Sequence, residues 1–402
     1  MISSINSMDS FIILSQCSFF TPPFWALFLR RSTQSVKPSW LAAILFLNSV
    51  ITAGESIPFA PNTIRALVIA PQVPPHFIPP PKLQPIAAAD VCRTGFGDCK
   101  GLSNYTRAML KELGIASTYT IISTTNERLL PDFSSANQMN HVILQVPLPQ
   151  DTLWLECTNP SLPFGYVHQD IAGHDALLIE PDGGKMCRLP TYPDSLNTQH
   201  IAADITLSPT AEARIEVNEV SRIFQYENEA GIVYLEPNKQ KDRIRSGIHL
   251  SQADIRNLQI SECKEANPSI TFRYTATSNQ YGHKTGNRLF IPANVFRKEF
   301  SVPPLTKRTY PIHIDYGYTD TDSIRIQLPE GYVIEGLPKP LDVKSKFGSF
   351  HSDIQVKDKK ICIVHRLFMS KGVYSPDEYA AFLDFRKQVA GQYSGKIILK
   401  KE

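Results

Sequence analysis

The chain has 402 residues, of which 42% are hydrophobic and 20% are charged, and its formal net charge is +3. That length allows two or three domains, and the composition is typical of a soluble globular protein. The small net charge, without a block of lysines and arginines, argues against a nucleic-acid-binding surface and against electrostatic attachment to a membrane. We therefore expect no nucleic-acid partner. We also expect no stable membrane span, because the apolar runs near the N-terminus are interrupted by proline or too short.

The cysteines are scattered along the chain, and no two of them form a C-x-x-C pair. This spacing argues against a zinc ribbon and against a redox motif. A chain of this length also needs no disulfide framework for stability. Because seven is an odd number, at least one thiol stays free or pairs between chains.

Residues 1–85 are predicted to form an atypical, apolar and proline-rich segment that is poorly ordered. The apolar run from Trp40 to Ala53 is too short to span a bilayer comfortably, and it resembles the hydrophobic region of a signal peptide. The alternative is an apolar segment without a targeting role. Residues 58–85 contain nine prolines, which disfavour both a helix and a central strand, so we expect extended polyproline-type chain there.

The first well-patterned helix is expected directly after residue 98. Apolar residues recur at helical spacing from Leu102 to Leu113, and Gly114 is a typical residue at a helix C-terminus. Cys99 therefore lies in the first turn, where unpaired N–H groups and the partial positive charge of the helix favour a thiolate. A thiolate is the form that attacks a carbonyl carbon, so Cys99 is a candidate nucleophile.

Short strands are predicted after this helix, at residues 117–122, 141–146, 152–156, 176–179 and 185–189. His141 begins the second of them and Glu156 ends the third, and the intervening 147–151 suits a hairpin loop. A cysteine nucleophile needs an imidazole as base, and the imidazole needs an acceptor that orients it. Cys99, His141 and Glu156 are therefore predicted to form a catalytic triad.

Other readings of these residues are weaker. A single cysteine in a helix is more often a small buried hydrophobe, so the inference depends on all three residues occurring together. Asp132 and Asp151 are alternative acids, but they fall in a loop and in a turn. His168 and His174 lack a glutamate in metalloprotease register, so we expect no catalytic zinc, and no motif indicates another cofactor.

The remaining residues, 196–402, are predicted to be β-rich with one late helix. Alternating strand patterns recur in them, as at residues 213–217, 270–274 and 323–328. Ser375 and Glu378 form a capping-box pattern with proline at the first helical position, which predicts the start of that helix. The expected fold class is α+β, with a core at about residues 86–195 followed by this β-rich region.

The segments around the candidate triad resemble the signature blocks of the bacterial transglutaminase-like superfamily. The resembling blocks are residues 97–101, 131–133, 139–143, 154–158 and 162–166. The resemblance is strongest to a branch of secreted multidomain proteins and covers roughly residues 83–402, so the N-terminal β domain of that branch is expected to be missing or altered here. It implies a papain-like core in which Cys99 is the nucleophile, His141 the general base and Glu156 the orienting acid.

The resemblance also implies thiol acyl transfer. We expect hydrolysis of a peptide or amide bond rather than crosslinking, because nothing marks an amine-acceptor site. The expected partner is a peptide or protein, such as a cell-envelope component, and the expected location is extracytoplasmic, either periplasmic or secreted. The alternative is a catalytically inactive cell-envelope scaffold or binding protein that uses the β-rich region.

Overall fold

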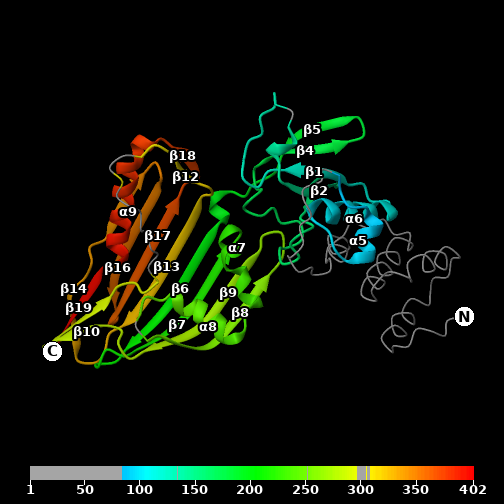
Figure 1. The fold of residues 1–402 in the computed structure, drawn as a ribbon. Helices are drawn as coiled ribbons and strands as arrows, with labels where there is room; N and C mark the ends of the chain where they lie inside the picture. Colours follow the sequence, from blue (N-terminus) through cyan, green and yellow to red (C-terminus); the bar gives the residue numbers. More distant parts are fainter. Residues whose placement is uncertain (1–83, 134, 251, 297–304, 306–307) are drawn as a thin grey trace, which may run out of the picture. The chain divides into compact units, whose positions relative to one another are not determined.

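The computed structural model describes residues 84–402, except 134, 251, 297–304, 306 and 307. Contacts divide the chain into two compact units, and the division lies between Thr191 and Tyr192. The architecture is α+β with a β-rich C-terminal region, as predicted from the sequence (Figure 1). The predicted segment 1–85 lies outside the described residues apart from its last two.

The N-terminal unit packs helices against a five-stranded antiparallel sheet with the order β3-β2-β1-β4-β5. Its helices and strands are α5 (Ala88–Thr94), α6 (Cys99–Glu112), β1 (Thr118–Ile122), β2 (His141–Pro147), β3 (Thr152–Leu155), β4 (Asp175–Glu180) and β5 (Gly183–Arg188). The predicted helix and strands are present to within a few residues. Helix α5 was not predicted, and its one buried residue, Val91, leaves it without an apolar stripe.

Helix α6 is held against β2 by apolar packing and by one buried hydrogen bond. Leu110 of the helix shares a buried cluster with Leu144 and Val146 of the strand. The Ser103 hydroxyl donates to the carbonyl oxygen of Val142 at 3.2 Å. Ser103 lies one turn after the start of α6, and Val142 is the second residue of β2. This bond therefore keeps the first residue of the helix near the first residue of the strand.

The C-terminal unit is built on an eight-stranded sheet with the order β15-β16-β17-β13-β6-β7-β9-β8, in which β13 and β6 are parallel and the other neighbours antiparallel. The strands are β6 (Thr198–Leu207), β7 (Ala213–Arg222), β8 (Asp254–Cys263), β9 (Ser269–Ser278), β13 (Tyr318–Gln327), β15 (Leu341–Ser345), β16 (Gly348–Lys357) and β17 (Lys360–Met369). In β6, Ile201, Ala203 and Ile205 are buried whereas His200 and Asp204 are exposed. One face of this sheet is thus apolar and the other polar, which explains the alternating sequence pattern.

Smaller elements cover the apolar face. They are β10 (His283–Thr285), β11 (Arg288–Pro292), β12 (Ile312–Ile314), β14 (Tyr332–Gly336), β18 (Gly372–Tyr374), β19 (Lys396–Lys401), α7 (Phe224–Ala230), α8 (Pro237–Ser246) and α9 (Tyr379–Tyr393). Strands β10, β11, β19 and β14 form a second sheet, and β11 and β19 share the main apolar core with the large sheet. Figure 1 shows α9 near β16 and β17 and α8 near β8, toward the other edge of the same sheet.

Helix α9 is the late helix predicted from the sequence. The capping box is present, because Ser375 and Glu378 satisfy each other's backbone N–H groups at the preceding short turn. Helices α7 and α8 were not predicted. Helix α8 buries only Ile244 and so shows no apolar stripe, although Pro237 at its first position was an available start signal. No helix in the described part of the chain is long and apolar enough to cross a membrane.

Candidate active site

Cys99 is the first residue of α6. The preceding Asp98 caps the helix, because its Oδ1 accepts a hydrogen bond from the Gly101 N–H at 2.9 Å. The Lys100 ammonium lies 2.6 Å from the other oxygen of the same carboxylate. Asp98 therefore fixes the first turn of the helix, and the partly exposed thiol of Cys99 lies where backbone N–H groups are unpaired.

His141 begins β2 and lies opposite Ile122, the last residue of β1. Its Nε2 is 2.7 Å from Oε2 of Glu156, and its ring interacts electrostatically with the Cys99 side chain. Since Nε2 faces the carboxylate, Nδ1 is the nitrogen left for the thiol. The structure thus brings the three predicted residues together in the order thiol, imidazole, carboxylate.

Glu156 directly follows β3, and four donors surround its buried carboxylate. Oε1 accepts the Thr158 N–H at 2.7 Å and also the Thr158 hydroxyl. Oε2 lies beside Nε2 of His141 and 3.4 Å from Nε2 of His168. Both oxygens are therefore hydrogen-bonded, which offsets the cost of burying a carboxylate.

The charges of the site follow from these contacts. Burial alone lowers the pKa of His141, but its hydrogen bonds to Cys99 and Glu156 outweigh burial and raise the pKa to about 10. Burial raises the pKa of Glu156, but the hydrogen bonds from His141, His168 and Thr158 hold that pKa well below its usual range. At neutral pH the site therefore contains an imidazolium that interacts with the Glu156 carboxylate and with the Cys99 side chain.

The alternative acids are placed elsewhere. Oδ1 of Asp151 accepts from the Thr152 N–H at 2.7 Å in the β2–β3 turn, and Asp132 is an exposed loop residue. The sequence analysis did not predict that Thr158 and His168 contact Glu156. Thr158 is the last residue of the block 154–158, and His168 lies two residues after the block 162–166, so position in or near a block was the only signal available.

Three side chains of the site could also hold a metal ion. One nitrogen of His141, one nitrogen of His168 and one oxygen of Glu156 lie within 4.8 Å of one another, and they form the one such group within the described ranges. Zinc binds imidazole through a nitrogen lone pair. Here the nitrogens that face Glu156 donate hydrogen bonds to it, so a metal ion would have to replace those bonds.

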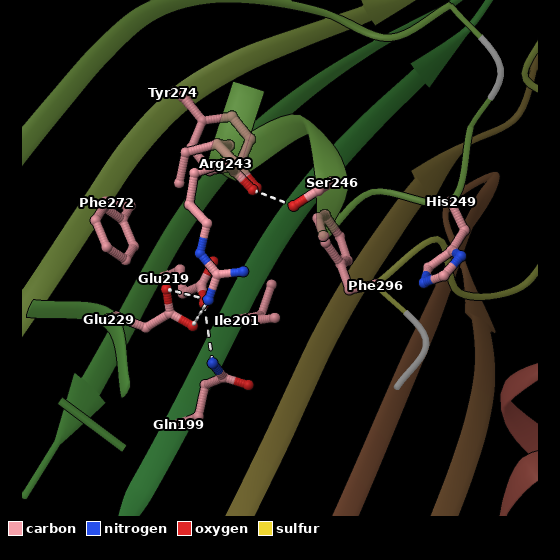
Figure 2. Close-up of a pocket in the computed structure, with 12 residues that line it drawn as sticks. Gln199, Ile201, Glu219, Glu229, Arg243, Ser246, His249, Phe272, Tyr274 and Phe296 are labelled. Carbon is pink, nitrogen blue, oxygen red and sulfur yellow. Dashed lines mark hydrogen bonds and ion pairs between the residues drawn. The ribbon is translucent and has the colours of Figure 1, made fainter. Parts of the chain in front are cut away.

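A pocket with a cavity of about 200 Å³ lies in the C-terminal unit (Figure 2). Its walls come from β6, β7, β9, α7, α8 and nearby loops, with the lining residues Gln199, Ile201, Glu219, Glu229, Arg243, Ile244, Ser246, Gly247, His249, Phe272, Tyr274 and Phe296. Arg243 donates to both carboxylate oxygens of Glu229 at 3.3 Å, and Gln199 donates to Glu219 at 3.0 Å. The Ser246 hydroxyl donates to a backbone carbonyl. The lining therefore offers a mixed surface of charged, aromatic and aliphatic side chains rather than a nucleophile paired with a base.

The family match lies in the C-terminal unit, whereas the similarity to a solved structure covers most of the chain. Residues 287–399 match a family described as a domain of unknown function with a solved structure (DUF3858). No curated protein matches the chain. A solved structure from Parabacteroides distasonis ATCC 8503, described as a "putative protease", is similar at 10% sequence identity with a TM-score of 0.45. The similarity covers 97% of this chain and 57% of that one, so this chain spans little more than half of that protein's length.

Proposed function

We propose that this chain is a transglutaminase-like thiol acyl-transfer protein that hydrolyses a peptide or amide bond through Cys99, His141 and Glu156. The observation that carries the proposal is the His141–Glu156 hydrogen bond of 2.7 Å, with the Cys99 side chain interacting with the same imidazole. The sequence blocks that contain these residues resemble the family in the same order. Geometry and resemblance thus support the same three roles.

The proposed reaction has two steps. In the first, the Cys99 sulfur attacks the carbonyl carbon, and His141 donates its proton to the leaving nitrogen as the C–N bond breaks. In the second, water attacks the thioester while His141 accepts a proton, and Cys99 leaves. Glu156 keeps the imidazole oriented and stabilises its charge throughout. The Cys99 backbone N–H, at the start of α6, supplies one donor for the oxyanion.

We propose a peptide or a protein of the cell envelope as the substrate, and an extracytoplasmic location, periplasmic or secreted. Both statements rest on the family resemblance of the sequence blocks. We propose hydrolysis rather than crosslinking because we identify no binding site for an acceptor amine near Cys99 among the described residues.

A second candidate function is a binding protein that keeps the fold without turnover. The pocket in the C-terminal unit favours it, because a cavity of about 200 Å³ with charged and aromatic walls suits a small polar ligand. Such a protein would need no reactive thiol. The state of Cys99 therefore separates the two candidates.

The proposal is tested by incubating the full chain with a peptide library and detecting new peptide termini by mass spectrometry. We expect the wild type to cleave a subset of peptides and Cys99→Ser to lose that activity by roughly a thousandfold or more. Cys263→Ser is the matched control, because Cys263 is an exposed cysteine of the C-terminal unit, and it should cleave as the wild type does. Equal cleavage by Cys99→Ser and the wild type would exclude Cys99 as the nucleophile.

A further inference from the structure

The Glu156 carboxylate has a second imidazole neighbour that the triad does not use. Nε2 of His168 lies 3.4 Å from Oε2 of Glu156, the same oxygen that His141 contacts. The side chains of His168, His141 and Glu156 are 11%, 14% and 6% exposed, so little water competes for these contacts. We infer that His168 is a positioning residue, which donates to Oε2 and holds Glu156 in the orientation that His141 requires. This inference rests on the proposed function.

Glu156 needs such support because of where it lies in the chain. It follows the last residue of β3, so strand pairing does not fix it. A glutamate side chain also has one more rotatable bond than an aspartate, and each rotamer that must be excluded costs conformational entropy. Thr158 holds only Oε1. Without His168, Oε2 would keep only the His141 contact, and the carboxylate could turn about its bonds to Thr158.

His168 is itself well placed to act as a fixed donor. Its backbone carbonyl accepts from the N–H groups of Ile171 at 3.1 Å and Ala172 at 3.0 Å, which closes a turn. The flanking residues Tyr166 and Val167 are buried, as are Ile171 and Ala172. The imidazole therefore projects from a packed turn that is separate from strand β2, which carries His141, and from the residues after β3, which include Glu156. Its contact with Glu156 joins these segments at the site.

The test compares a substitution that keeps a donor with one that removes it. His168→Gln places an amide N–H₂ near the position of Nε2, whereas His168→Leu keeps an apolar side chain without a donor. We expect His168→Leu to slow iodoacetamide labelling of Cys99 at neutral pH, and any peptide cleavage, roughly tenfold, because a hydrogen bond to a charged group is lost. His168→Gln should recover both to within about threefold of the wild type. His168→Met replaces the leucine variant if that variant does not fold.

The pH profile separates positioning from a purely structural role. In His168→Leu the decline of Cys99 labelling on the acid side should begin at a higher pH than in the wild type, because a loosely held Glu156 stabilises the His141 imidazolium less. His174→Leu is the matched control. His174 lies nearby in the chain, but its Nδ1 bonds to the Ser123 carbonyl at 2.7 Å, so its loss should change Cys99 labelling less than about twofold.

The inference is overturned if His168→Leu labels Cys99 as fast as the wild type, or if the leucine and glutamine variants are equally slow. It is also overturned if a chelator abolishes labelling or cleavage by the wild type, since His168 would then act as a metal ligand. The proposed function itself would be refuted by a different result, namely that Cys99 of the wild type labels no faster than the exposed Cys263.

Discussion

The Glu156 side chain is only 6% exposed, yet it stays charged because four donors surround its two oxygens. Substitution by glutamine keeps the size of the side chain and changes only the chemistry of one oxygen. The new amide group can donate to Nε2 of His141, which would leave Nδ1 protonated and unable to accept from Cys99. A wrong imidazole tautomer should disable the base while the fold persists.

We therefore predict that Glu156→Gln lowers the turnover of a cleaved peptide by about 10³- to 10⁴-fold. Steady-state kinetics and circular dichroism on the same sample measure activity and fold together. The conservative Glu156→Asp retains the charge and is the control, with a smaller loss because its carboxylate falls one methylene short. Wild-type turnover by Glu156→Gln would remove Glu156 from the proposed triad.

Three residues of this site could be predicted from the sequence, whereas His168 could not. Cys99, His141 and Glu156 each stand at an end of a regular element, and each lies in a block that resembles the transglutaminase-like superfamily. His168 has neither advantage, because it lies in an irregular turn and meets Glu156 only through tertiary packing. The spacing of His168 and His174 in the sequence only raised the question of a zinc-binding motif. That question does not bear on whether His168 contacts a carboxylate.

Asp98 caps helix α6, whose first residue is Cys99. Loss of this cap should therefore affect both the stability of the N-terminal unit and the reactivity of the Cys99 thiol. We predict that Asp98→Ala lowers the free energy of unfolding of the N-terminal unit by about 1 kcal/mol, as loss of an N-cap usually does. Cys99 labelling should slow in the same variant, because the first turn frays. Urea unfolding and labelling kinetics measure the two effects.

Ser375→Ala is the matched substitution for that experiment. Ser375 also caps a helical segment, and its hydroxyl and Glu378 complete a capping box in the C-terminal unit. The loss of stability should again be about 1 kcal/mol, with Cys99 labelling unchanged. If both variants slow labelling equally, the effect of Asp98 is not specific to the start of α6.

Local patterns predicted strands better than they predicted pairing. Alternation in β7, β9 and β13 was visible because one face of the large sheet is buried and the other is polar. The parallel pairing of β13 with β6 was not predictable, since β13 lies far along the chain from β6 and no local motif joins them. Helix α8 was not predicted because it buries a single side chain, that of Ile244, and so its sequence shows no apolar periodicity.

The stability of the whole chain should depend on pH through a histidine outside the site. His365 of β17 is fully buried, its Nδ1 lies 3.3 Å from the Asn294 amide, and its Nε2 has no hydrogen-bond partner among the described residues. Burial lowers the pKa of His365 to about 4. Between about pH 6.5 and pH 4 the unfolded chain therefore binds a proton that the folded chain does not, so stability falls as the pH falls.

The size of this effect is about 3 kcal/mol across the full window, from a difference in pKa of roughly 2.5 units. Urea unfolding at several pH values between 7 and 4 measures it. His365→Phe is the comparison, because His365 packs against the rings of Phe350 and Tyr393 and an aromatic ring should fit there. That variant should lose the His365 part of the pH dependence. Identical pH slopes for both proteins would show that His365 does not titrate as described.

The matched family lies within the C-terminal unit, whereas the candidate triad lies in the N-terminal unit. The family match does not test the triad, so the proposed chemistry is best tested through the reactivity of the Cys99 thiol. Two other cysteines of the chain serve as internal controls. Cys263 is exposed, and burial raises the pKa of Cys157 to about 12, so the first reports an ordinary accessible thiol and the second an inert one.

Iodoacetamide labelling of the native full chain at pH 6, followed by peptide mass mapping of the cysteines, compares these thiols in one sample. An ordinary thiol with a pKa of about 8.5 is almost entirely protonated at this pH and reacts slowly. We predict that Cys99 labels at least about tenfold faster than Cys263, that Cys157 stays unlabelled, and that His141→Gln removes the advantage of Cys99. Labelling of Cys99 no faster than that of Cys263, or a rate that His141→Gln leaves unchanged, would contradict the proposed thiolate–imidazolium site.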